Sequence, residues 1–162
     1  MRPLDGDSMV RMGWLARHGW MLLFGVALTM VIFGVTDIVA GAGADPAIAR
    51  ALTGMTLAEL EAESAAAYGL YDFMTRVNGW SLVLIGALLA VIVFIPFRRG
   101  GRWAWLAAWA LPLWAAGVPL FYIGTGLAAG EAPPPPMISG PIVAIFSAGL
   151  LLATRPHPAE AT

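Results

Sequence analysis

The chain has 162 residues, 59% of them hydrophobic and only 12% charged, and its formal net charge at pH 7 is −1. A soluble domain carries about 25% charged residues, so this chain has too little polar surface for a globule in water. The near-neutral charge offers no basic patch for nucleic acid. The absence of cysteine excludes disulfides, thiolate metal sites and cysteine nucleophiles.

Four long apolar runs predict four membrane-spanning helices, at roughly residues 20–40, 79–97, 103–125 and 137–154. Each is close to the roughly 20 residues that a helix needs to cross the hydrocarbon core of a bilayer. Backbone polar groups find no water there, so each run should be helical. The first run is too long for a cleaved signal peptide, which favours a retained span. We therefore predict an all-α membrane protein with a single domain, a four-transmembrane-helix bundle, over residues 1–162.

The connection between the first two runs, about residues 45–75, is too long for a turn and predicts a short helical cap. Asp45 followed by Pro46 is typical of a helix start, and Gly54 is typical of a helix end. We expect this first short helix to lie over one mouth of the bundle.

A second short helix is predicted to begin at Thr56. The pair Thr56 and Glu59 has the spacing of a capping box, in which each side chain satisfies a backbone N–H of the other. We expect this helix to bend near Gly69 and to continue into the second span.

Arginine placement predicts the orientation. Arginines precede the first run, occupy the turn between the second and third runs, and follow the fourth: Arg2, Arg11, Arg17, Arg98, Arg99, Arg102 and Arg155. The positive-inside rule then puts both termini in the cytoplasm and the cap outside. In the turn, Arg98, Arg99 and Arg102 are expected to contact anionic lipid of the inner leaflet.

Four consecutive prolines at residues 133–136 precede the fourth run. Such a stretch favours polyproline II, a stiff spacer without internal hydrogen bonds.

Ionisable groups inside the hydrocarbon usually mark function, because they are costly there. The second, third and fourth runs have none between their ends, which argues against a proton-coupled exporter or ion pump. Near the outer end of the first run lies Asp37, and Asp72, Arg76 and Asn78 lie on the approach to the second. The i, i+4 spacing lets Asp72 and Arg76 pair on one helix face. This group is either an outer-face site where Arg76 binds an anionic head group or a structural ion pair. The residues favour the ion pair.

The third run combines bulky aromatics with prolines. Trp109, Trp114 and Tyr122 could line a pocket open to the outer face. Pro112 and Pro119 each free a carbonyl four residues earlier, which a cavity or neighbouring helices must satisfy. The alternative, which we favour, is that the tryptophans fill space and the prolines bend the helix.

Stripes of small residues predict close helix packing, because lipid supplies no hydrophobic drive between helices. The clearest is on the fourth run, and shorter ones occur on the first two: Gly140, Ala144 and Ala148; Gly79 and Gly86; Gly25 and Thr29. These stripes serve the bundle, a homo-oligomer or a partner subunit.

No metal or cofactor is expected. A haem or metal site at His18 needs a second ligand, and the only other histidine in the sequence is His157 in the tail.

The run Phe97–Trp105, which reads FRRGGRWAW, is followed by Trp109 and Pro112. This pattern resembles that of small bacterial four-helix membrane proteins with no assigned activity. The likeness extends over about residues 45–115. It implies a four-helix fold in a bacterial cytoplasmic (inner) membrane and implies no chemistry.

These features favour a non-enzymatic accessory or structural subunit that packs against a larger membrane complex, respiratory or photosynthetic. The alternative is an outer-face pocket for a lipid or lipophilic small molecule, with or without catalysis. A small transporter is a weaker alternative, because the spans lack a central charge. The expected partners are the lipid bilayer and other membrane subunits or further copies of the chain, and no nucleic acid.

Overall fold

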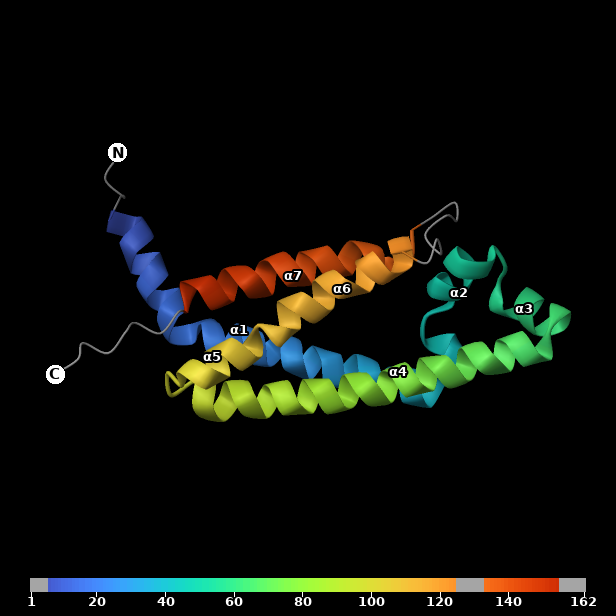
Figure 1. The fold of residues 1–162 in the computed structure, drawn as a ribbon, viewed down its shortest axis with the longest axis horizontal. Helices are drawn as coiled ribbons and strands as arrows, with labels where there is room; N and C mark the ends of the chain where they lie inside the picture. The colour runs from blue at the N-terminus through green and yellow to red at the C-terminus, as the bar shows by residue number, and fades with distance from the viewer. Residues whose placement is uncertain (1–5, 125–132, 155–162) are drawn as a thin grey trace.

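The computed structural model describes residues 6–124 and 133–154, and every regular element within them is helical (Figure 1). In chain order the elements are α1 (Gly6–Ala40), the 3-10 turn η1 (Gly41–Ala44), α2 (Pro46–Thr53), α3 (Leu57–Glu63), α4 (Ala65–Ile92), the π-helical segment η2 (Val93–Phe97), α5 (Arg102–Ala108), α6 (Ala110–Gly124) and α7 (Pro135–Ala153). The prediction of an all-α chain is confirmed for this part of the protein.

Four helical stretches among the described residues are long and apolar enough to cross a membrane, as predicted. They are Arg17–Ala44, Ala65–Phe97, Arg102–Gly124 and Pro135–Ala153. The first two exceed the predicted spans because their helices continue through polar residues beyond the apolar runs. Residue 125, the predicted end of the third span, lies outside the described residues. The described chain has the architecture of a multi-pass membrane protein.

Two short helices, α2 and α3, lie beside one another at one end of the molecule, and we call them the cap (Figure 1). The Asp45 side chain accepts a hydrogen bond from the Ile48 amide at 3.3 Å, and Gly54 ends α2 with a φ of 75°. These are the predicted start and stop of the first short helix, and both are local consequences of side-chain capping and glycine's freedom at positive φ.

The second short helix starts as predicted but ends differently. Thr56 and Glu59 form the capping box, with the Thr56 amide donating to Glu59 Oε2 at 2.7 Å. The predicted bend near Gly69 is wrong. The chain breaks at Ser64, whose extended backbone and hydrogen bond from the Ala67 amide at 3.2 Å begin a new helix. Gly69 lies inside α4 because this capping serine already provides the break.

The long helices form two pairs, and the first is α1 with α4. Glycines set the distance between the two backbones. A Cβ added at Gly34 would lie 2.5 Å from the backbone oxygen of Gly79, and one added at Gly86 would lie 2.8 Å from that of Ala27. The predicted Gly79 and Gly86 stripe therefore serves packing within the chain.

The second pair is α6 with α7, and here a proline creates the contact. Pro119 has no N–H, so it leaves the Ala115 carbonyl without its intrahelical donor. Gly140 of α7 packs against that carbonyl, since a Cβ there would lie 2.7 Å from the Ala115 oxygen and 3.1 Å from Pro119 Cδ. The close approach depends on glycine at this position.

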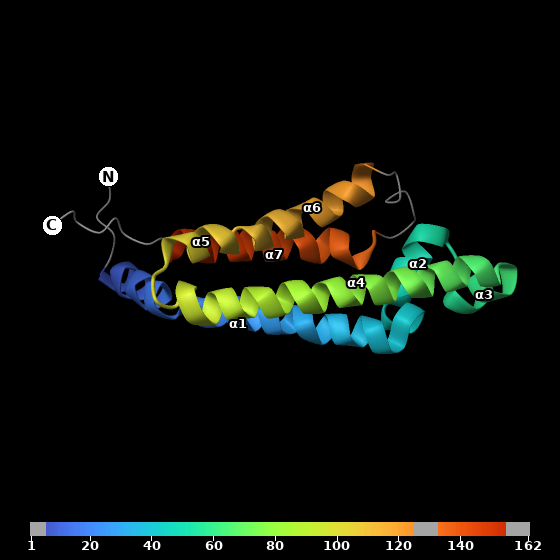
Figure 2. The ribbon, with the colours of Figure 1, turned by 60° about the horizontal axis from the view of Figure 1, so that its bottom comes forward.

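The two pairs meet in a shared core at the end of the molecule opposite the cap (Figure 2). α1, α4 with η2, α5 with α6, and α7 all contribute buried side chains to it: Leu23, Ala27, Met30, Leu89, Val93, Phe97, Ala104, Ala108, Leu111, Leu150 and Leu151. In the cap-side half, α6 makes its extensive contact with α7 and none of comparable size with α1 or α4 among the described residues. The molecule is therefore tightly packed at one end and more open at the other.

Prolines account for two local departures from regular α-helix, and two further prolines begin a helix. Pro96 cannot donate the regular α-helical hydrogen bond, and the helix widens to a π-turn in which the Arg98 amide donates to the Val93 carbonyl at 3.1 Å. The third span is divided at Trp109, which leaves Pro112 in the first turn of α6, where an N–H is not needed. The prediction of a polyproline II spacer at residues 133–136 is wrong for Pro135 and Pro136, because both already belong to α7.

Candidate functional site

The polar group predicted near the outer end of the first two spans is brought together at the corner between α1, η1 and α4. Arg76 donates from Nε to Asp72 Oδ2 at 2.8 Å and from Nη2 to Asp72 Oδ1 at 3.2 Å. Its Nη1 donates to the carbonyl of Ile38. The same Asp72 Oδ1 accepts from the Ala42 amide at 2.9 Å. This one ion pair thus satisfies a carbonyl near the end of α1 and an amide of the following turn.

Glycine at position 41 is required by this corner. Its φ is 54°, a left-handed conformation that L side chains avoid. An added Cβ would overlap Asp72 Oδ1 and would lie 2.6 Å from Arg76 Nη2. The ion pair can therefore reach the backbone only because no side chain stands at Gly41.

Asp37 and Asn78 form a second link between α1 and α4, one helical turn away. Asn78 Nδ2 donates to Asp37 Oδ2 at 3.0 Å. Asp37 thus pairs with the amide of Asn78 and makes no ion pair with Arg76. A third link joins α4 to the cap, since the Tyr71 hydroxyl donates to the Asp45 carbonyl at 3.0 Å.

The hydrogen bonds of Arg76 determine whether this corner can also bind a ligand. All three nitrogens of the Arg76 guanidinium donate hydrogen bonds to groups of the chain itself, although the side chain is 45% exposed. An arginine that is already engaged on every side has little capacity left for an anionic head group. The geometry favours the structural interpretation of Asp37, Asp72, Arg76 and Asn78 over a binding site.

The three residues of the predicted outer-face pocket differ in their surroundings. Trp109 packs edge-on against Trp105 at 5.8 Å between ring centroids and joins the core, while Trp114 is 39% exposed. Tyr122 lies half-buried near the end of α6. None of the three lines the cavity described below. A pocket formed by these three residues therefore stays a prediction.

The small-residue stripe of α7 is only partly exposed. Gly140 faces α6 within the chain, and Ala144 and Ala148 are half-buried. The stripe on α1 differs, because Gly25 and Thr29 are exposed and nothing lies within 4 Å of a Cβ built at Gly25.

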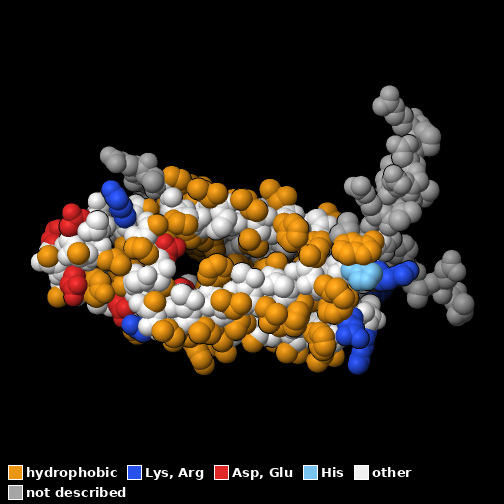
Figure 3. Space-filling view, turned by 180° about the vertical axis from the view of Figure 1, so that it is seen from behind, with side chains coloured by type: hydrophobic (Ala, Val, Ile, Leu, Met, Phe, Trp, Pro, Cys, Tyr) orange, Lys and Arg blue, Asp and Glu red, His pale blue; other side chains and the backbone are white. Residues whose placement is uncertain are grey.

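The end of the molecule opposite the cap carries the arginines Arg17, Arg98, Arg99 and Arg102, and we call it the arginine end (Figure 3). All four side chains are exposed. Arg98 lies over the rings of Trp20 and Phe94, at 5.2 and 5.4 Å from their centroids. These are cation–π distances, which hold the guanidinium at the protein surface.

A cavity of about 110 Å³ opens at the arginine end. Its walls come from α1, the η2–α5 turn, α5 and the residue that follows α7: Arg17, Trp20, Phe97, Arg98, Gly100, Gly101, Trp105 and Thr154. Of these only Arg98 was a predicted site residue. Sequence reasoning missed the rest because they come together from three distant segments, and only the clustering of arginines hinted at the location.

Among the side chains that the structure describes, no group of three His, Asp or Glu residues could hold a metal ion. Outside the spans, the pKa of Glu59 is held below its ordinary value by hydrogen bonds from the Thr56 amide and hydroxyl. Its contacts belong to the capping box and have no catalytic geometry.

Comparison with known proteins identifies no relative: no family model, no curated protein and no solved structure matches this chain. The resemblance carried by residues 97–105 therefore stays a prediction, and the function must be argued from the residues of the chain itself.

Proposed function

We propose that this chain is a non-enzymatic subunit of a larger assembly in a bacterial cytoplasmic membrane, respiratory or photosynthetic in type. The observation that carries the proposal is the incomplete packing between the two helix pairs. Toward the cap the described residues of the two pairs form no shared core, and the surface is hollowed between them (Figure 3). Large apolar side chains near the cap-side ends of α1 and α6 are exposed, including Leu120, Ile123 and Val39 at 66%, 61% and 74%.

A partner helix of another subunit would complete this half of the structure. In a bilayer, helices associate through close van der Waals packing, and open faces with small residues permit it. Such a face lies on α1 nearer the arginine end, where Gly25 and Thr29 are exposed and the described chain places nothing against Gly25. A second copy of the chain would use the same surface, which makes a homo-oligomer the simplest form of the proposal.

The polar residues support a role without chemistry. The hydrogen bonds of Asp72 with Arg76 and with the Ala42 amide hold helices together, and so does the bond of Asn78 to Asp37. A proton carrier or nucleophile needs a group with free capacity and a base or acid beside it. The hydrogen bonds of Asp45, Glu59 and Ser64 cap helices, and those of Asp37, Asp72 and Arg76 link helices, so these groups serve the fold.

The orientation that we propose has both termini and the arginine end in the cytoplasm and the cap outside. Four of the six arginines whose side chains are described lie at one end of the long helices, and Arg50 and Arg76 lie at the other (Figure 3). The described carboxylates all lie at that second end, and they are those of Asp37, Asp45, Glu59, Glu61, Glu63 and Asp72. This separation is the distribution that the positive-inside rule associates with a cytoplasmic arginine end.

Purification from native membranes in mild detergent tests the proposal, with mass spectrometry of the proteins and lipids that co-purify. We expect a stoichiometric partner subunit or a defined oligomer. The variant Gly25→Leu should release it while the chain stays folded, because open space surrounds that position. Gly149→Leu is the matched control on α7, where a Cβ also meets nothing within 4 Å. A chain that purifies alone and as a monomer would refute the proposal.

The second candidate is an outer-face site for a lipid or lipophilic small molecule, which the hollow between the pairs and the exposed Trp114 favour. The same purification distinguishes it. A monomeric chain that carries one defined lipophilic molecule, lost in Trp114→Ala and retained in Gly25→Leu, would support this candidate over the subunit role.

A further inference from the structure

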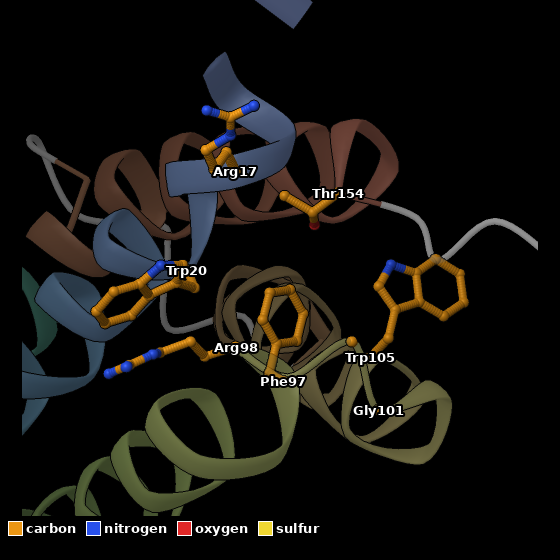
Figure 4. A pocket seen from close by; sticks show the side chains of 8 residues that line it. Arg17, Trp20, Phe97, Arg98, Gly101, Trp105 and Thr154 are labelled. Carbon is orange, nitrogen blue, oxygen red and sulfur yellow. The ribbon is translucent and has the colours of Figure 1, made fainter. Parts of the chain in front are cut away.

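The cavity at the arginine end combines an aromatic wall with an arginine rim (Figure 4). Trp20, Phe97 and Trp105 supply three aromatic side chains, and Arg17 and Arg98 lie at the edge on the two sides of Trp20. Trp105 is fixed in position because its Nε1 donates to the Leu151 carbonyl at 2.8 Å. Both arginine side chains are exposed, and Figure 4 shows their guanidiniums directed away from the cavity on opposite sides of Trp20. To contact a group bound in the cavity, Arg17 has to turn inward and Arg98 has to leave its position over Trp20 and Phe94.

The backbone at this cavity departs from regular helix because of Pro96 and Gly100. The π-segment at Val93–Phe97 turns Phe97 inward, where it is buried. Gly100, at a φ of 78°, then reverses the chain, and the Gly101 amide donates to the Pro96 carbonyl at 2.9 Å. A Cβ at Gly101 would lie 2.9 Å from that oxygen. π-turns recur at functional sites in proteins, so their coincidence with a cavity is informative.

The cavity carries positive charge without a described counterion. The salt bridge of the described residues is Arg76–Asp72, at the far end of α4. The carboxylates of the described side chains, from Asp37 to Asp72, lie toward the cap, the length of the spans away from Arg17 and Arg98. Two positive charges at one cavity, without a carboxylate nearby among the described side chains, attract an anion.

We propose that this cavity binds one phosphate group. A guanidinium presents donors in a planar fork that matches phosphate oxygens, and two guanidiniums at one rim can share the charge of a single group. The aromatic wall fits the apolar part of a phospholipid beyond its head group. The source of the phosphate is therefore a phospholipid head group of the adjacent leaflet or a soluble phosphate. This inference is independent of the proposed subunit role, because it concerns the opposite end of the molecule.

The site is distinct from general attraction between arginines and anionic lipid. Arg99 and Arg102 lie in the same turn and are equally exposed, yet neither lines the cavity. They carry the same charge as Arg17 and Arg98 and differ in position. This difference provides a matched control for an experiment on the full chain.

The test is native mass spectrometry of the full chain released from detergent, titrated with phosphatidylglycerol, with diacylglycerol as a lipid without phosphate, and with inorganic phosphate. For Arg17→Ala/Arg98→Ala we expect the apparent affinity for phosphatidylglycerol to fall about tenfold or more, as for loss of charge-assisted hydrogen bonds. Arg99→Ala/Arg102→Ala, with the same change in net charge, should bind like the wild type. Diacylglycerol should not bind at the site.

The lipid and soluble sources are separated in the same titration. Binding of phosphatidylglycerol alone identifies the head group of a lipid, whereas inorganic phosphate that binds the wild type and displaces the lipid identifies a soluble phosphate. Equal losses in the two double variants, or no loss in either, would overturn the proposal. Arg17→Gln/Arg98→Gln keeps the polar stems and replaces the alanine pair if that pair does not elute like the wild type on size exclusion.

Discussion

A side chain at Gly41 would overlap the carboxylate of Asp72, thirty-one positions further along the chain. The left-handed turn at Gly41 brings the Ala42 amide to that carboxylate, and Arg76 holds the carboxylate in place from the other side. The corner between the first two spans is thus a single unit of backbone and ion pair. Its integrity depends on Gly41 as well as on Asp72 and Arg76, and no local sequence pattern connects Gly41 to that pair.

The first prediction concerns this turn. Gly41→Ala should lower the thermal stability of the detergent-solubilised chain, by more than the roughly 1–2 kcal/mol that a left-handed L-residue costs by itself. The added clash with Asp72 is the reason. Size exclusion after a temperature series gives the midpoint of unfolding. Gly43→Ala is the control, since its Cβ would meet nothing within 4 Å. Equal midpoints for the two variants would contradict the assignment.

The second prediction separates charge from geometry at Arg76. Arg76→Lys keeps the charge but cannot donate at once to both oxygens of Asp72 and to the Ile38 carbonyl. We expect it to lower the midpoint nearly as much as Arg76→Ala, measured by the same heating assay. Arg50→Ala, an exposed arginine of the cap, should have little effect. If Arg76→Lys behaves like the wild type, the role of Arg76 is charge alone and a head-group site regains support.

The third prediction concerns the contact of α6 with α7. Gly140→Leu forces a side chain against the Ala115 carbonyl and Pro119, and overpacking of this kind costs about 1–3 kcal/mol or more. We expect a lower unfolding midpoint and earlier aggregation on heating. Gly149→Leu lies on the same helix with open space around it and should leave the midpoint unchanged. A tolerated leucine at position 140 would show that the two helices are further apart than described.

The fourth prediction concerns pH at the cap. The Thr56 amide and hydroxyl hold the pKa of Glu59 below its ordinary value, so the ionised form is favoured in the folded cap. The stabilisation is present above the ordinary carboxyl pKa and is lost as pH falls through the depressed one. The amide resonances of Thr56 and Glu59 should shift in NMR with a midpoint below the ordinary pKa. In Glu59→Gln this titration should vanish, and an unshifted midpoint would exclude the capping box.

The fifth prediction concerns orientation, and the natural absence of cysteine makes it direct. A single cysteine introduced as Glu61→Cys in α3 should react with a membrane-impermeant maleimide added outside intact cells or spheroplasts. Arg99→Cys in the turn before α5 should react only after the cells are opened. The reverse pattern would invert the proposed topology and move the phosphate-binding cavity to the outer leaflet.

The sequence by itself determined the features that depend on neighbours along the chain. The four spans follow from unbroken apolar length, and the caps at Asp45 and Thr56 follow from side chains that accept hydrogen bonds from amides three residues away. The pairing of Asp72 with Arg76 follows from one helical turn of separation. The two caps and the ion pair each join residues that are close in the sequence, so composition and spacing suffice to predict them.

Only the tertiary structure decided how distant segments meet. The sequence could not say that α1 pairs with α4, that the Ala115 carbonyl faces Gly140, or that Arg76 reaches Ile38. Nor could it place the break at Ser64 and not at Gly69, because both residues permit one. The cavity between Arg17, the π-turn and Thr154 joins segments that are more than fifty residues apart. In a membrane-spanning helix nearly every position is apolar, on the lipid-facing side as well as on the protein-facing side. The periodicity of apolar residues therefore does not show which helix face packs against the other helices, and the packing itself selects that face.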